Sequence, residues 1–345
     1  MTGTTTSSPP TSRALTGPAE SEPASCVGRL HEVREARRLL ARHPVVTLTG
    51  PGGVGKTLLA RRIAADIRGD FRDGVAFVEL AELRDAELLA NTVADKLGLY
   101  DQSERPPLDV ISDYLRDRRF LLALDNCEHL VDASGAFVAA LVSECPRLTV
   151  LTTSRQSLGV EGEQLFPVPP LSVPDIDAVQ SPADLRRYEA PQLFVDRAAA
   201  VAPEFAVTDG NCRDIAALCR DLEGLPLAIE LAAVRLRSLS LDQIRARLSD
   251  RLSLLSQGNQ DGPHRQLTMR ALIDWSYQLC DPAERLVLAR ASVFSGGFGL
   301  DAAEQVCGGA GVDGDDVLDL LHGLVDKSLL IGEEVAGVIR YRMLE

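Results

Sequence analysis

The sequence predicts an α/β domain with a parallel sheet and helices on both faces, followed by an all-α helical domain and a winged-helix domain. Three observations support this order. Up to residue 172, short apolar runs alternate with segments of helical periodicity, the pattern of a parallel sheet with crossover helices. From residue 188 the apolar residues repeat mainly at helical spacing. Two short strand-like runs then close the chain and form a ribbon behind the last helices.

The length and composition limit the possible function classes. A chain of 345 residues is too long for one ordinary domain, and 45% hydrophobic residues is normal for a globular protein. The net charge of −14 argues against a protein built mainly to hold nucleic acid or an anionic membrane. No apolar run reaches membrane-spanning length, and residues 1–24 have the composition of a disordered tail, not of a secretory signal. Seven cysteines without C-x-x-C spacing indicate reduced thiols in a cytoplasmic protein.

The α/β domain is expected over residues 25–172. Its helices are predicted where apolar residues recur at helical spacing, over 30–42, 58–67 and 86–97. Its strands are predicted at short apolar runs, over 44–49, 74–80, 120–124, 148–153 and 164–168. The β-branched run at 44–49 is typical of a buried strand, as expected in a parallel sheet.

A linker rich in Pro, Ser and Asp is expected over 173–187. The helical domain, 188–260, should contain helices near 190–201, 211–222, 226–237 and 241–255. The winged-helix domain, 261–345, should contain helices near 266–280, 281–294, 301–307 and 315–325, then a hairpin over 328–332 and 338–343. Asp281 and Asp301 each precede a glutamate by three residues, which predicts that both cap helices. The chain stops directly after its last strand, which suggests a fragment of a longer protein.

The most specific motif is a glycine-rich run that follows the first strand and opens a helix. It reads Gly50-Pro51-Gly52-Gly53-Val54-Gly55-Lys56-Thr57 and fits G-x-x-x-x-G-K-[ST]. Glycines let the backbone wrap around phosphates, and the helix N-terminus adds positive potential. Lys56 should reach the β- and γ-phosphates, and Thr57 should bind Mg²⁺. We therefore predict a P-loop domain that binds ATP or ADP through Gly50, Gly52, Gly53, Val54, Gly55, Lys56, Thr57 and Leu58.

Acidic residues follow the third strand. Asp125 ends that apolar strand, which is the Walker B arrangement, so Thr57 and Asp125 are the predicted metal ligands. Asn126 comes next, and an amide cannot take a proton from water. Glu128 is the candidate catalytic base; the alternative is a solvated loop glutamate.

Two weaker motifs come later in the chain. Thr153-Ser154-Arg155 closes the fourth strand, where Arg155 could contact the γ-phosphate and distinguish ATP from ADP. The alternative is a surface arginine that pairs with an acidic neighbour. Gly224-Leu225-Pro226-Leu227 has proline at a position typical of a helix start, and alone it indicates only a helix boundary.

Together these residues resemble the STAND ATPases of the NB-ARC type. Val27-Gly28-Arg29, the P-loop, the strand ending at Asp125, the run ending at Arg155 and Gly224-Leu225-Pro226-Leu227 occur in the order of that family. The chain looks most like bacterial regulators of the AfsR and large ATP-binding LuxR types. Asp125-Asn126-Cys127-Glu128-His129, Trp275-Ser276-Tyr277 and Leu324-Val325-Asp326-Lys327-Ser328-Leu329 are similar to that group.

The resemblance implies three domains folded around one nucleotide. Arg29 and Pro226, with Val27 and Leu227, would border the adenine, and Arg155 would sense the γ-phosphate. ADP would hold the domains closed, whereas ATP would open them so that the protein binds copies of itself. An inducer would act through a sensor module that this chain lacks. The family often has an M-H-D motif whose His reads the β-phosphate; Met343-Leu344-Glu345 stands here, and leucine cannot donate that hydrogen bond.

The predicted function is therefore an ATP/ADP-binding switch of a bacterial regulator with slow Mg²⁺-dependent ATP hydrolysis. The alternatives are a transcription factor that binds DNA directly through its winged helix, and a constitutive P-loop ATPase. Direct nucleic-acid binding is not expected, because acidic residues crowd the last helix, namely Asp313, Asp315, Asp316, Asp319 and Asp326.

Overall fold

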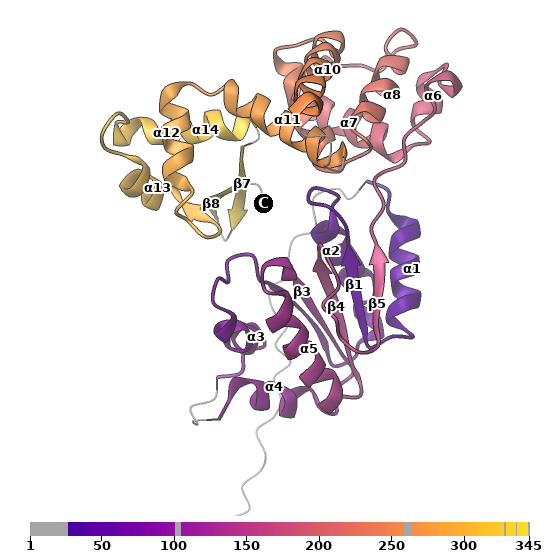
Figure 1. Ribbon diagram of the computed structural model, residues 1–345, viewed down its shortest axis with the longest axis vertical. Helices are drawn as coiled ribbons and strands as arrows, with labels where there is room; N and C mark the ends of the chain where they lie inside the picture. The colour runs from indigo at the N-terminus through magenta and orange to yellow at the C-terminus, as the bar shows by residue number, and fades with distance from the viewer. Residues whose placement is uncertain (1–26, 101–104, 259–263, 328, 336, 344–345) are drawn as a thin grey trace, which may run out of the picture.

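The computed structural model describes residues 27–100, 105–258, 264–327, 329–335 and 337–343 (Figure 1). The tail predicted over 1–24 lies outside the described residues. So do the break after Gly258 and Leu344, the position of the family histidine.

The N-terminal part is an α/β unit. Its elements are α1 (Leu30–Leu40), β1 (Val45–Thr49), α2 (Lys56–Asp66), η1 (Arg68–Asp70), β2 (Gly74–Glu79), η2 (Ala86–Leu88), α3 (Leu89–Lys96), α4 (Pro107–Leu115), β3 (Phe120–Asp125), η3 (Cys127–His129), α5 (Val131–Glu144), β4 (Leu148–Ser154) and β5 (Glu163–Pro167). The strands form one sheet in the order β2-β3-β4-β1-β5, and every pairing is parallel. The prediction of a parallel sheet is therefore confirmed.

Alternate residues of the central strands pack into two cores on opposite faces of the sheet. On one face, Val46 and Leu48 of β1 and Leu121 of β3 pack with residues of α1 and α2. On the other face, Val45 and Leu122 join residues of α3, α4 and α5. Successive residues of a strand point to opposite faces of the sheet, and here both sets are apolar. Helices therefore cover both faces of the sheet. Figure 1 shows these layers around the sheet.

Helices follow the sheet in the middle of the chain. They are η4 (Ile176–Ala178), α6 (Pro182–Leu185), α7 (Glu189–Val201), α8 (Cys212–Asp221), α9 (Pro226–Ala233), η5 (Val234–Arg237), α10 (Leu241–Gly258) and α11 (His264–Gln278). The core that covers the α1–α2 face continues into these helices through residues such as Phe194 and Ile229. The segment predicted as a linker carries η4 and α6, and its Val179 and Leu185 are buried in this same core.

The C-terminal part has a core of its own. It contains α12 (Pro282–Ala291), β6 (Phe298–Gly299), α13 (Leu300–Cys307), η6 (Gly314–Asp316), α14 (Val317–Asp326), β7 (Leu330–Val335) and β8 (Val338–Met343). The strands pair antiparallel in the order β6-β8-β7, so β6 adds a strand to the predicted hairpin. The Asp281 cap is confirmed by a reciprocal capping box with Glu284. The Asp301 cap is wrong, because α13 begins at Leu300 with Gly299 as its N-cap, so Asp301 lies in the first turn.

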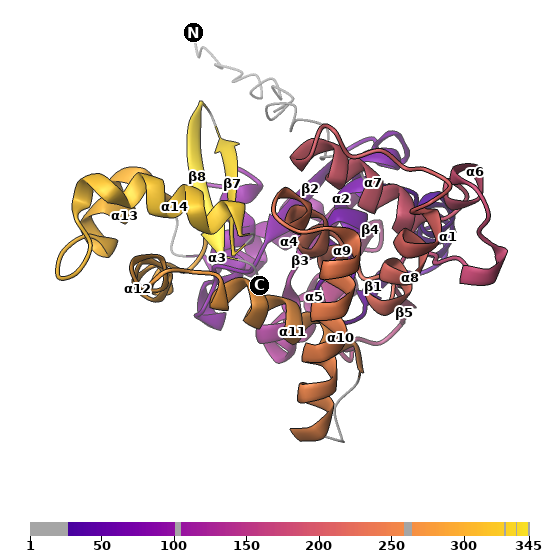
Figure 2. The same ribbon diagram turned by 90° about the horizontal axis from the view of Figure 1, so that it is seen from above.

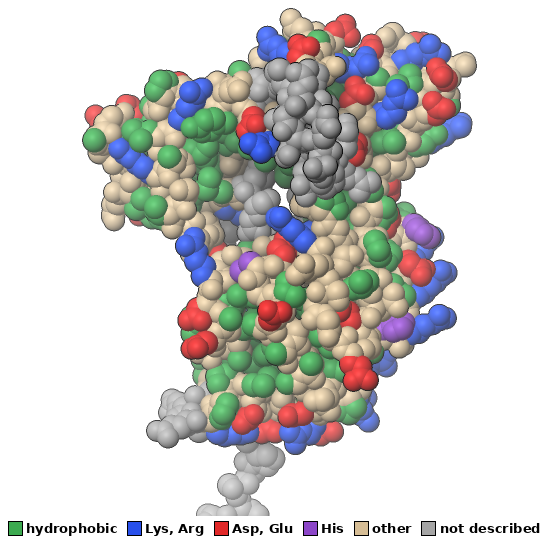
Figure 3. All heavy atoms as spheres, in the orientation of Figure 1, with side chains coloured by type: hydrophobic (Ala, Val, Ile, Leu, Met, Phe, Trp, Pro, Cys, Tyr) green, Lys and Arg blue, Asp and Glu red, His purple; other side chains and the backbone are tan. Residues whose placement is uncertain are grey.

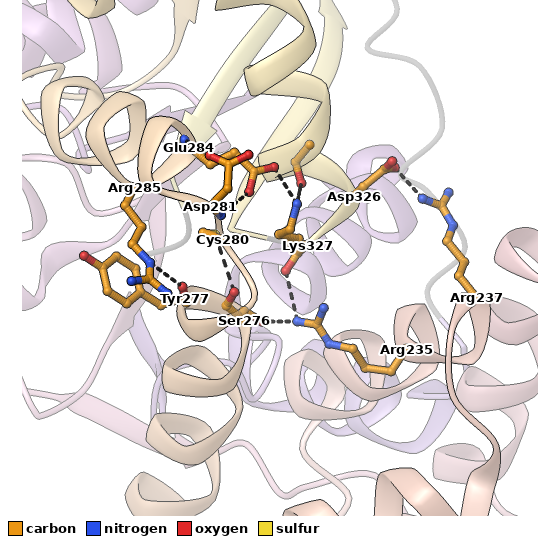
Figure 4. A network of polar contacts seen from close by, with 11 residues as sticks. Arg235, Arg237, Ser276, Tyr277, Cys280, Asp281, Glu284, Arg285, Asp326 and Lys327 are labelled. Carbon is orange, nitrogen blue, oxygen red and sulfur yellow. Dashed lines mark hydrogen bonds and ion pairs between the residues drawn. The ribbon is translucent and has the colours of Figure 1, made fainter. Parts of the chain in front are cut away.

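A polar network joins the middle helices to the C-terminal part (Figure 4). The buried guanidinium of Arg235, in η5, donates hydrogen bonds to the Ser276 hydroxyl at the end of α11 and to the Lys327 carbonyl after α14. Beside it, Arg237 forms an ion pair with Asp326. The C-terminal part also touches the α/β unit, where the Gly297 N–H donates to Glu82 over 3.1 Å. Figure 2, seen from above, shows the C-terminal part beside the middle helices.

No helix in the described part of the chain is long and apolar enough to cross a membrane.

Candidate functional site

The glycine-rich loop joins β1 to α2 at the carboxyl edge of the sheet. Gly53 and Gly55 have φ values of 75° and 91°, in the left-handed region that favours glycine, and Gly55 is the N-cap of α2. A Cβ atom at Gly53 would lie 2.7 Å from Cε of Met269 in α11 and 3.0 Å from Cβ of Leu227 in α9. The loop therefore follows a backbone path that glycine permits, and two helices of the middle part press against it.

Lys56 is held inside this loop. Its Nζ donates hydrogen bonds to the carbonyl oxygens of Gly50, at 3.0 Å, and of Pro51, at 3.3 Å. The side chain is buried, and burial lowers its pKa, as does Arg155, whereas the charges of Glu128 and Asp125 raise it. The ammonium group thus lies at the centre of the loop among carbonyls that phosphate oxygens could replace as its partners.

Asp125 ends β3 beside the first turn of α2. Its Oδ1 accepts hydrogen bonds from the hydroxyls of Thr57, at 3.0 Å, and Thr153, at 2.6 Å. Burial raises the pKa of Asp125, and the two hydroxyl hydrogen bonds oppose that rise. A buried carboxylate and a hydroxyl are hard oxygen donors of the kind that Mg²⁺ prefers. The described residues hold no cluster of three or more His, Cys, Asp or Glu that could bind a metal.

Glu128 and Arg155 face each other across the ends of β3 and β4. Nε of Arg155 lies 3.1 Å from Oε1 of Glu128, and Oε2 of Glu128 is buried without a hydrogen-bond partner. Asn126 has a left-handed φ of 66° that turns the chain after β3, and its N–H donates to the Thr153 hydroxyl. Nη2 of Arg155 would lie 3.8 Å from a Cβ placed on Gly52. Arg155 therefore does pair with an acidic neighbour, but this pair lies against the P-loop.

The Val27–Arg29 segment packs behind the P-loop. The buried guanidinium of Arg29 donates to the carbonyls of Val54, at 3.0 Å, and Pro169, at 2.6 Å, and pairs with Glu32. Its backbone N–H donates to Glu189 of α7. Val27 is partly buried against the same core. The side chain of Arg29 thus supports the backbone of the P-loop through the Val54 carbonyl.

The start of α9 contacts the loop from the opposite side. The N–H of Leu227 donates to the Gly53 carbonyl over 3.2 Å, and Cγ of Pro226 would lie 3.8 Å from a Cβ on Gly55. Leu58, in the first turn of α2, is partly exposed. The structure thus brings the residues expected to bind nucleotide into one region of space. Figure 3 shows a surface hollow between the α/β unit, the middle helices and the C-terminal part, and basic and acidic side chains border it.

Two residues at this site were not assigned a role from the sequence. Thr153 hydrogen-bonds Asp125, and this contact depends on β4 lying next to β3 in the sheet, an order that the local sequence does not specify. Met269 touches the P-loop from α11, and nothing local in the sequence indicates this contact, because it depends on how α11 packs.

Comparison with known proteins agrees with this geometry. A family model described as the NB-ARC domain matches residues 28–162. An uncharacterized protein of Mycobacterium tuberculosis is 39% identical over 321 residues, which cover 93% of this chain and 78% of that protein. Another protein of that species, named as a candidate HTH-type transcriptional regulator, is 43% identical over 309 residues, covering 90% of this chain and 33% of its own length.

Two further similarities extend this result. Regulatory protein AfsR of Streptomyces griseus is 30% identical over 314 residues, covering 86% of this chain and 28% of AfsR. The chain therefore spans about a third of the length of the regulators that it matches. Among solved structures it is similar to a signal transduction ATPase with numerous domains from Pyrococcus horikoshii that has a tetratricopeptide repeat sensor. The TM-score is 0.56 at 18% identity, over 95% of this chain and 43% of that one, which is a likeness of fold.

Proposed function

The chain belongs to the NB-ARC family of P-loop ATPases and is related to AfsR, and from this premise we propose that it is the ATP/ADP-binding switch of a bacterial regulator. Two contacts at Gly53 carry the proposal. The helices of the middle part clasp the P-loop, because Leu227 of α9 donates to the Gly53 carbonyl and Met269 of α11 packs on Gly53. A phosphate group that displaces the loop would therefore also displace those helices.

Each proposed site residue has a part in holding the nucleotide. Lys56 and the loop residues from Gly50 to Leu58 bind the phosphates, and Thr57 with Asp125 holds Mg²⁺, which neutralises phosphate charge when bound. Val27, Arg29, Pro226 and Leu227 border the base. Arg155 contacts the γ-phosphate. The carboxyl ends of the parallel strands β1, β3 and β4 meet at one edge of the sheet. The side chains that follow these strands can therefore act on one ligand.

We propose three domains, at 25–172, 188–260 and 261–345. Residues 173–187 link the first domain to the second, and the third domain is a winged helix. Opening between them would let copies of the protein assemble in the cytoplasm, in response to an inducer read by a sensor elsewhere in the full protein. The separate core of the C-terminal part, which begins at Cys280, supports a division before the last domain, since a part with its own core can move as a unit. Leu272 of α11 instead packs in the core of the middle helices.

Hydrolysis should be slow. Asn126 stands where a second acid could activate water, and the next carboxylate, Glu128, lies two residues further along the chain. A general base contributes typically about 10²–10⁴-fold, so a poorly available one leaves turnover well below about 1 s⁻¹. The full chain, denatured after purification, should release an adenine nucleotide on chromatography, and steady-state phosphate release should be slow. Absence of any nucleotide together with no calorimetric binding of ATP or ADP would exclude the proposal; fast turnover would favour a constitutive ATPase.

Direct DNA binding by this chain is not expected. Aspartates occupy η6 and α14, and Lys327 is already paired with Glu284. A helix that carries this charge would be repelled by the phosphates of a DNA groove. We predict no duplex binding in a gel-shift assay at physiological salt. Submicromolar affinity for any duplex would instead support a transcription factor that acts through its winged helix.

A further inference from the structure

The pair between Glu128 and Arg155 is asymmetric in its surroundings. The Glu128 side chain is 15% exposed, whereas that of Arg155 is 61% exposed. Only one carboxylate oxygen of Glu128 meets the arginine, while the other is buried without a hydrogen-bond partner. A buried carboxylate that loses its partner is costly. Glu128 therefore depends on Arg155, while the arginine can swing from its exposed position toward another anion.

Such an anion would bind within reach of the same arginine. Nη2 of Arg155 lies near Gly52 of the P-loop, and the charges of Glu128, Arg155 and Asp125 all act on Lys56. A γ-phosphate, which Lys56 would hold together with the β-phosphate, would therefore also meet the guanidinium of Arg155 and the carboxylate of Glu128. It would attract the arginine and be repelled by Glu128, and an ATP molecule carries this additional phosphate whereas ADP does not.

We infer that Glu128 sets the nucleotide preference of the site, because its carboxylate and the γ-phosphate compete for the guanidinium of Arg155. This inference rests on the proposed function. ADP leaves the Glu128–Arg155 pair intact, whereas ATP must break or share it. The pair thus favours ADP over ATP, and the carboxylate of Glu128 becomes available to accept a proton from water only when a γ-phosphate has drawn Arg155 away.

The test is the ratio of affinities for a non-hydrolysable ATP analogue and for ADP, measured on the full chain by calorimetry with Mg²⁺. Glu128→Gln should raise this ratio in favour of the ATP analogue by about three- to tenfold, the size expected for losing one partly exposed ion pair and one like charge. The matched control is Glu79→Gln. Glu79 also ends a strand of this sheet and pairs with an arginine, Arg61, so its loss removes the same charge nearby. The control should leave the ratio unchanged.

A double-mutant cycle separates competition from simple repulsion. In the Arg155→Gln background, Glu128→Gln relieves only the repulsion between this carboxylate and the γ-phosphate. The affinity ratio of the ATP analogue to ADP should therefore rise clearly less than it does in the native background. Arg155→Gln alone should lower the ratio, and this measurement remains available if Glu128→Gln folds poorly. Equal gains in both backgrounds, or no gain in the native one, would overturn the inference. If ADP itself fails to bind the native chain, the proposed function fails instead.

Discussion

Replacing Lys56 with alanine should weaken the binding of both ADP and ATP by about 100-fold or more. The side chain is buried at the centre of the P-loop, and its ammonium group donates to the carbonyls of Gly50 and Pro51. Charge-assisted hydrogen bonds are worth about 1.5–3 kcal/mol each, so losing the ones that Lys56 makes to phosphate accounts for a loss of this size. Calorimetry with each nucleotide measures it.

The control for this change is Lys96→Ala. Lys96 ends α3 on the exposed surface of the α/β unit, so the variant loses the same charge from the same domain and should bind normally. Both variants should keep the native circular dichroism spectrum. Native-like nucleotide affinity in the Lys56 variant would show that phosphates bind elsewhere and would remove the P-loop from the proposal.

Replacing Asp125 with asparagine should lower ATP hydrolysis by about 10²–10³-fold without lowering stability. The loss follows from the metal site, because an amide oxygen carries no charge to hold Mg²⁺ against the phosphates. The stability should rise, because burial raises the pKa of Asp125 and the ionised carboxylate therefore disfavours the folded state. The hydroxyls of Thr57 and Thr153 can still donate to the asparagine carbonyl.

The sign of this effect gives a pH test. Above the folded-state pKa of Asp125 the native carboxylate is ionised at a cost, so the variant should melt higher than the native chain near neutral pH without nucleotide. As the pH falls through that raised pKa, the native carboxyl takes up a proton and the difference in melting temperature should shrink. Asp117→Asn makes the same change on an exposed loop and should alter neither hydrolysis nor melting. A lower melting temperature for Asp125→Asn at neutral pH would contradict the prediction.

Local sequence determined much of this protein. The P-loop is eight consecutive residues between a strand and a helix, so its glycine conformations and its place at the start of α2 follow from neighbouring residues alone. The apolar runs that became β1, β3 and β4 were visible for the same reason, since strands buried on both faces are mostly apolar. The Asp281 capping box is likewise complete within four residues.

The tertiary structure decided the features that join distant parts of the chain. β6 is two residues long and exists because β8 lies beside it, so no local pattern could indicate it. Glu128 meets Arg155 because β3 and β4 are neighbours in the sheet, an order that periodicity does not specify. The contacts of Leu227 and Met269 with Gly53 depend on α9 and α11 packing over the P-loop. The sequence by itself thus determined which chemical groups the site contains, and packing decided which of them face each other, because such contacts depend on the order of the strands and the docking of the helices.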